Sequence, residues 1–170
     1  MPTRAALPTV TGPAVPAVHA GAPTGGTLVV GTVVGGPLGG WPGARPRPQR
    51  RVVVADDDGD QRLLVEIAVR RAGHDVVASA VDGTEALAAA RTWLPDLLVL
   101  DVAMPGMSGL EVCAALRADP RTAGVRVLLV TAAAGPAAVR AGSAAGADGY
   151  VVKPFRVRDL SARVAALLVA

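Results

Sequence analysis

Cysteine, lysine and aromatic residues are all scarce in this sequence. The single cysteine, Cys113, cannot form a disulfide within the chain, and its small apolar neighbours predict a place in the core. His19 and His74 have no second His or Cys at metal-ligand spacing, which argues against a zinc site. Only one of the 17 basic residues is a lysine, Lys153, so the position of that residue is of particular interest.

Acidic residues are absent from positions 1–50, which carry four Arg, most of the prolines and half of the glycines. Such a segment has little apolar surface to offset the entropy lost on ordering, so we predict a disordered Pro/Gly/Ala-rich tail. Residues 51–170 carry 13 Lys and Arg against 14 Asp and Glu. The net charge of +3 therefore comes from the tail and does not indicate a nucleic-acid-binding fold.

Long apolar runs are also missing. The longest stretch in the tail, residues 28–34, is flanked by glycine and is far shorter than the roughly 20 residues of a membrane span. The tail also lacks the basic start and continuous apolar core of a signal peptide. We therefore expect no membrane attachment and a cytoplasmic protein.

Short apolar runs alternate with segments of helical periodicity after the tail. The expected strands are 51–55, 75–80, 97–100, 126–130 and 147–152. The expected helices are one capped by Asp60 and ended by Gly73, followed by 85–93, 109–117, 136–145 and 157–168. Five strand-then-helix units with short connections predict an α/β fold, in which helices cover both faces of a parallel sheet.

Two of these helices have a predicted buried face. In the first helix the expected apolar face consists of Leu63, Leu64, Ile67 and Ala68. In the last helix it consists of Leu160, Val164, Leu167 and Leu168. Both sets follow the spacing that places side chains on one side of a helix.

Asp101 directly follows the most apolar run, residues 97–100, and Met104-Pro105-Gly106 then starts a loop. Right-handed crossovers bring the carboxyl ends of all parallel strands to one edge of the sheet, which is where such sheets bind ligands. We therefore expect five polar residues to converge there: Asp56, Asp57, Asp101, Thr131 and Lys153. The alternative for Asp101 is a carboxylate that only caps a loop.

Three carboxylates at one edge repel one another and call for a cation, and oxygen ligands favour Mg²⁺. A hydroxyl and an ammonium, from Thr131 and Lys153, are suited to the oxygens of a phosphoryl group. A carboxylate can itself accept a phosphoryl group. These residue types together predict a Mg²⁺-assisted phospho-aspartate site.

The same residues resemble the receiver domain of bacterial two-component response regulators. The resemblance covers about residues 51–168 and rests on four motifs in order: Asp56-Asp57, Asp101 with Met104 to Gly109, Thr131-Ala132, and Lys153-Pro154-Phe155. It implies a flavodoxin-like, doubly wound sheet of five parallel strands in the order 2-1-3-4-5.

For the site, the resemblance implies that Asp101 accepts a phosphoryl group from a histidine kinase or a phosphotransfer protein, so the chain is a switch and not an enzyme. It implies that Mg²⁺ is held by Asp57, Asp101 and the backbone carbonyl of Ala103, with help from Asp56. It further implies that phosphoryl oxygens contact Thr131, the backbone of Ala132, and Lys153.

For the response, the resemblance implies that Thr131 moves inward and that Tyr150 turns into the space it leaves. This motion would change the surface formed by residues 136–145, 147–152 and 157–168, which is then the expected contact for a downstream protein or a second copy of the chain. The alternative for Tyr150 is an ordinary edge aromatic.

Three positions depart from the family pattern. Gly59 stands where the family often has proline, which predicts a looser loop after Asp56 and Asp57. Ala103 and Ala133 occupy positions that, in the family, tune how fast the phosphoryl group is lost. Two small apolar side chains there predict a long-lived phospho-aspartate.

Other functions fit the sequence less well. A nucleic-acid-associated regulator acting through the tail would have only four Arg spread over 50 residues, so we do not expect nucleic acid as a partner. A phosphatase of the haloacid dehalogenase type would want a second Asp where Ala103 stands. An inactive scaffold is a further alternative. Because the sequence ends soon after its last helix, we expect either a stand-alone receiver or a piece separated from its output partner.

Overall fold

The computed structural model describes residues 48–169, and the predicted tail lies almost entirely outside them. Five parallel strands form one sheet in the order β2-β1-β3-β4-β5. The strands are β1 (Arg51–Ala55), β2 (Asp75–Ala80), β3 (Leu97–Asp101), β4 (Arg126–Thr131) and β5 (Gly149–Val152). The predicted fold class and strand order are confirmed.

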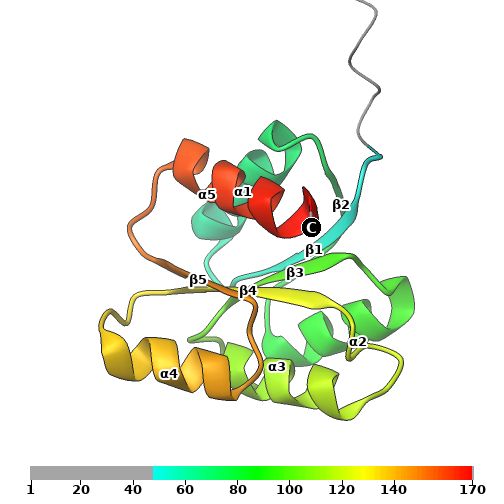
Figure 1. Ribbon diagram of the computed structural model, residues 1–170, viewed down its shortest axis with the longest axis vertical. Coiled ribbons are helices and arrows are strands. Elements are labelled where there is room, and N and C mark those ends of the chain that lie inside the picture. The colour runs from blue at the N-terminus through cyan, green and yellow to red at the C-terminus, as the bar shows by residue number, and fades with distance from the viewer. Residues whose placement is uncertain (1–47, 170) are drawn as a thin grey trace, which may run out of the picture. The chain divides into compact units, whose positions relative to one another are not determined.

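Helices cover both faces of the sheet (Figure 1). They are α1 (Gly59–Arg71), α2 (Gly83–Trp93), α3 (Gly109–Ala118), α4 (Pro136–Ala144) and α5 (Val157–Val169). In Figure 1, α1 and α5 lie on one face, and α2, α3 and α4 lie on the other. Each strand is followed by a helix, so every connection is a crossover that returns the chain to the same edge of the sheet.

The core has two halves, one on each face of the sheet. Successive side chains of a strand point to opposite faces, so the apolar runs of β1, β3 and β4 supply both halves. Every residue of β3 is buried, as its position in the middle of the sheet requires. Cys113 of α3 is fully buried in one of these halves, which confirms its predicted role as a core side chain.

The predicted buried face of α1 is wrong, except for Ala68. Leu63, Leu64 and Ile67 are 54%, 38% and 44% exposed, whereas Val65, Ala68 and Val69 are buried. The helix carries two apolar stripes at the same spacing, and the stripe with smaller side chains faces the sheet. In α5, by contrast, Leu160, Val164 and Leu168 are buried as predicted, and Leu167 is partly buried.

The start of α1 also differs from the prediction. Asp58 is the N-cap, and its side chain accepts hydrogen bonds from the backbone N–H groups of Asp60 and Gln61. Asp60 is a residue of the first turn. A run of four carboxylates within five positions offers several candidate caps, and only the backbone geometry selects one. Within residues 48–169 no helix is both long and apolar enough to cross a membrane.

Candidate functional site

The carboxyl edge of the sheet brings together the five residues predicted to converge there. Asp56 and Asp57 follow β1, while Asp101 is the last residue of β3 and Thr131 the last residue of β4. Lys153 follows β5. Asp56, Asp101 and Thr131 are buried, whereas Asp57 is exposed.

Lys153 lies between two of the carboxylates. Its Nζ is 2.8 Å from Asp56 Oδ2 and 2.8 Å from Asp101 Oδ1. Burial disfavours the ammonium charge, but the hydrogen bonds to Asp101 and Asp56 outweigh that effect and raise the pKa of Lys153 above its usual value. For Asp56 the balance is reversed, because burial raises its pKa despite the hydrogen bond and the charge of Lys153.

Asp101 is held at both of its oxygens. Oδ1 faces Lys153, and Oδ2 accepts a hydrogen bond of 2.8 Å from the backbone N–H of Ala103. The role predicted for the carbonyl of Ala103 concerns a different atom and stays a prediction. Asp101 therefore has a fixed orientation at the edge of the sheet, which is the requirement for a positioned acceptor.

The backbone around Asp101 is packed so closely that one neighbour must be glycine. A Cβ added to Gly109 would lie 2.2 Å from the carbonyl oxygen of Asp101. The N–H of Gly109 also donates to the carbonyl oxygen of Val102, at 3.0 Å. The first residue of α3 thus rests directly on the end of β3 and fixes the loop between them.

The donor set fits a hard cation. Asp56, Asp57 and Asp101 each offer a carboxylate oxygen, and the three oxygens lie within 4.8 Å of one another. Mg²⁺ prefers oxygen ligands and is commonly bound by one or two carboxylates together with waters. The exposed Asp57 has no hydrogen bond or ion pair for its side chain within residues 48–169, so it is available as a ligand.

Thr131 and Tyr150 are linked through a single residue, Ala133. Thr131 Oγ1 accepts a hydrogen bond of 3.0 Å from the N–H of Ala133. The hydroxyl of Tyr150 donates to the carbonyl oxygen of Ala133, at 2.7 Å. Ala132, which lies between Thr131 and Ala133 in the sequence, is exposed, and its contact with a phosphoryl oxygen stays a prediction.

Arg62 is a residue of this edge that the sequence interpretation missed. Its Nη1 donates a hydrogen bond of 2.7 Å to the backbone carbonyl of Asp56, from the first turns of α1. An arginine five residues after Asp57 carries no motif that would distinguish it from the other surface arginines.

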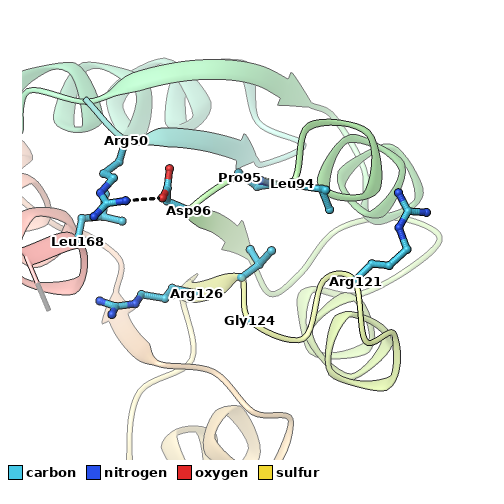
Figure 2. Close-up of a pocket in the computed structure, with 9 residues that line it drawn as sticks. Arg50, Leu94, Pro95, Asp96, Arg121, Gly124, Arg126 and Leu168 are labelled. Carbon is cyan, nitrogen blue, oxygen red and sulfur yellow. Dashed lines mark hydrogen bonds and ion pairs between the residues drawn. The ribbon is translucent and has the colours of Figure 1, made fainter. Parts of the chain in front are cut away.

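The opposite, amino edge of the sheet has a hollow of about 320 Å³ (Figure 2). Arg50 and Asp96 form an ion pair of 3.0 Å on its wall, and Arg121 and Arg126 contribute further positive charge. Figure 2 shows Arg121 and Arg126 coming from different sides of the hollow. None of the predicted site residues lines it.

Comparison with known proteins identifies a family. The family described as the response regulator receiver domain matches residues 52–165. The "DNA-binding response regulator MtrA" of Mycobacterium tuberculosis is 42% identical over 120 residues, which cover 71% of this chain and 51% of that protein. The "DNA-binding dual master transcriptional regulator RpaA" of Synechocystis is 43% identical over 118 residues, or 69% of this chain and 48% of that protein. The chain thus spans about half the length of these curated relatives.

Solved structures of other response regulators share the fold of this chain. The chemotaxis response regulator CheY4 of Vibrio cholerae is similar, with a TM-score of 0.66 and 33% identity, over 71% of this chain and 99% of that chain. A two-component response regulator of the LuxR family from Aurantimonas has a TM-score of 0.65 and 32% identity, over 71% of this chain and 86% of that one.

Proposed function

Because this chain belongs to the response regulator receiver family, we propose that it is a phosphorylation switch in which Asp101 is the phosphoacceptor. The single observation that carries the proposal is the placement of Asp101. One of its oxygens faces Lys153 and the other faces the N–H of Ala103, while two further carboxylates lie beside it. This combination supplies an acceptor, a counter-charge and a cation site within one cluster.

In the proposed reaction an oxygen of Asp101 attacks the phosphorus of the donor. The new O–P bond forms as the bond from phosphorus to the donor's leaving group breaks, and the leaving group departs with the bonding electrons. Asp56, Asp57 and Asp101 would hold Mg²⁺, which supplies positive charge to the phosphoryl oxygens. Lys153 adds a second positive charge, and the hydroxyl of Thr131 provides a hydrogen-bond donor.

The experiment is incubation of the protein with Mg²⁺ and acetyl phosphate, followed by measurement of the intact mass. The expected result is a gain of one phosphoryl group that is lost in Asp101→Asn. Asp148→Asn is a suitable control, because Asp148 is a carboxylate at the amino edge that pairs with Arg117. An unchanged mass for the wild type with acetyl phosphate and with phosphoramidate would favour the inactive scaffold instead.

We further propose that Thr131 and Tyr150 transmit the signal. A phosphoryl oxygen that takes a hydrogen bond from the Thr131 hydroxyl would compete with the present bond between Ala133 and Thr131. Ala133 also holds the Tyr150 hydroxyl, so a shift of this residue would release the ring. The face of α4, β5 and α5 would then change, and this face is the proposed contact for the downstream protein or for a second copy.

The phospho-aspartate should be long-lived. Ala103 and Ala133 are both exposed beside the site and offer no polar side chain to orient an attacking water. Introducing a polar side chain, as in Ala103→Asn or Ala133→Glu, should raise the rate of phosphoryl loss several-fold above the wild-type rate. The decay of the phosphorylated mass measures that rate. A wild-type half-life of seconds that these variants lengthen would contradict the prediction.

A histidine kinase or phosphotransfer protein is the proposed donor, and α1 supports a protein partner. Leu63, Leu64 and Ile67 form an exposed apolar stripe on the helix that begins beside the carboxylates. An apolar stripe next to a reactive site is suited to contact with another protein. Replacing Leu64 and Ile67 by Ser should slow transfer from a protein donor without slowing the reaction with acetyl phosphate.

Direct contact with nucleic acid is not part of the proposal, although the curated relatives named above are DNA-binding proteins. The match covers about half of each relative, and the receiver family model accounts for residues 52–165 of this chain. The cytoplasmic location of the protein and the disorder of residues 1–50 stay predictions. A salt-dependent mobility shift with DNA, lost on removal of residues 1–50, would instead favour the tail-mediated alternative.

A further inference from the structure

We propose that Arg62 is a positioning residue for the metal-binding loop, residues 56–59. In this role it is a strut: its hydrogen bond to the loop backbone compensates for the glycine at position 59. Gly59 predicts a loose loop after Asp56 and Asp57, yet this loop is tied at several points. Arg62 supplies one of these ties from the helix side. The part of the inference that concerns Mg²⁺ rests on the proposed function, whereas the part that concerns the order of the loop does not.

The ties of the loop can be followed atom by atom. The N–H of Asp56 donates to the carbonyl of Ala80, and the N–H of Asp58 donates to Asp56 Oδ1. Lys153 holds Asp56 Oδ2. The remaining polar atom of Asp56, its carbonyl oxygen, accepts from Arg62 Nη1 at 2.7 Å. Arg62 thus completes the fixing of Asp56 from a direction that no other described residue supplies.

Asp57 depends on this fixing more than its neighbours do. Its side chain has no hydrogen bond or ion pair within the described residues, so only the loop backbone aims it at the shared site. A ligand held by its backbone alone loses orientation when that backbone moves. Preorganisation of a metal ligand is worth affinity, because binding then does not have to order the loop.

The guanidinium of Arg62 lies close to Gly59. A Cβ placed on Gly59 would lie 3.7 Å from Nη2 of Arg62, an ordinary van der Waals distance, so the guanidinium lies beside this residue. The half-buried Arg62 side chain therefore covers the most flexible residue of the loop while it bonds to Asp56. The glycine leaves the loop backbone free, and the hydrogen bond from the arginine restores order.

The backbone at position 59 allows a proline to replace the ordering effect of Arg62. Gly59 is the first residue of α1, where proline is tolerated, and its N–H donates no hydrogen bond within the described residues. Asp58 has φ −79° and ψ 117°, the extended conformation that a residue before proline adopts. Gly59→Pro should therefore stiffen the loop without disturbing the helix start.

The test compares wild type with Arg62→Ala, Arg62→Lys, and the double variant Gly59→Pro/Arg62→Ala. Arg70→Ala is the matched control, because Arg70 lies on the same helix, is exposed and pairs with Glu66. The first measurement is hydrogen exchange of the Asp58 amide by NMR in metal-free protein. Arg62→Ala should accelerate this exchange about fivefold, as expected for the loss of one ordinary hydrogen bond.

The second measurement is the rate of reaction with acetyl phosphate as a function of Mg²⁺ concentration. Arg62→Ala should raise the half-saturating Mg²⁺ concentration about fivefold while the rate at saturation stays near the wild-type rate. Arg62→Lys, which keeps the charge and a donor, should restore part of the loss, and the double variant should restore most of it. Recovery by a neutral proline separates loop order from the effect of the arginine charge.

Two results would overturn the inference: unchanged exchange and Mg²⁺ dependence in Arg62→Ala, or a double variant no better than Arg62→Ala. If Arg62→Ala does not fold, Arg62→Lys and the double variant are compared with wild type in the same two measurements. If the wild type takes up no phosphoryl group but the Asp58 amide still exchanges faster in Arg62→Ala, the proposed function fails and the positioning role of Arg62 holds.

Discussion

At the amino edge of the sheet three carboxylates each pair with an arginine, whereas at the carboxyl edge three carboxylates lie together and one lysine pairs with two of them. The amino-edge pairs are Arg50 with Asp96, Arg91 with Asp119, and Arg117 with Asp148. Balanced pairs of this kind tie segments together. An excess of carboxylates instead costs stability until a cation arrives, so the same residue type is structural at one edge and poised for binding at the other.

Arg117 illustrates the structural role of charged residues at the amino edge. Its guanidinium donates to the carbonyl oxygens of Ala123, Val125 and Gly146, and it also binds Asp148 at 2.8 Å. Asp148 in turn accepts from the N–H of Val127 at the start of β4. One arginine therefore joins the end of α3 to the segments that lead into β4 and β5.

The largest expected effect on stability is at this edge. Arg117→Ala should lower the free energy of unfolding by about 3 kcal/mol, because several acceptors, most of them partly buried, lose their donor together. Arg121→Ala, an exposed arginine nearby whose side chain lines the amino-edge hollow, should change it by less than about 0.5 kcal/mol. Urea unfolding measures both. Equal effects of the two substitutions would contradict the contrast between the edges.

The next effect concerns the carboxyl edge. Mg²⁺ at 100 times its dissociation constant should raise the free energy of unfolding by about 2.7 kcal/mol, because it binds only the folded state. Asp57→Asn should remove most of this gain, and Asp75→Asn, an exposed acid at the amino edge, should leave it intact. Unfolding in urea with and without Mg²⁺ checks the prediction. A gain that Asp57→Asn leaves untouched would place the cation elsewhere.

A smaller effect, of opposite sign to most substitutions, is expected at Asp56. Burial raises the pKa of this carboxyl group, so folding disfavours its charge, and Asp56→Asn should stabilise the metal-free protein by on the order of 1 kcal/mol at neutral pH. Below the ordinary pKa of 3.8 the wild-type group is uncharged in both states and the difference vanishes. The difference should develop as the pH rises from 3.8 to the raised pKa of the folded state, and it should stay constant above that pKa. A difference that grows on acidification would contradict the assignment.

The two edges were predictable from the sequence to different degrees. Apolar runs predict the strands, and the handedness of crossovers predicts that the polar residues at their carboxyl ends lie together: Asp56, Asp57, Asp101, Thr131 and Lys153. The amino-edge pairs were not foreseen, because Arg117 and Asp148 are far apart in sequence and neither belongs to a motif. Side-chain pairing between distant surface residues depends on the exact path of the chain.

Local ambiguity explains the remaining errors. In α1 two apolar stripes share one spacing, and the choice between Leu64 and Val65 as the inward side is made by packing against the sheet. The N-cap was assigned to Asp60 although Asp58 holds the first turn. Arg62 was missed because its partner is a backbone carbonyl, which every residue possesses.

We propose that Asp101, and no other carboxylate of the cluster, carries the phosphoryl group. Treatment of the phosphorylated protein with borohydride converts an acyl phosphate into an alcohol, so a phosphorylated Asp becomes homoserine. Peptide mass spectrometry then identifies the modified position. The expected result is homoserine at position 101 only, in an amount that depends on Mg²⁺. Homoserine at position 56 or 57, or none after treatment with acetyl phosphate and Mg²⁺, would contradict it.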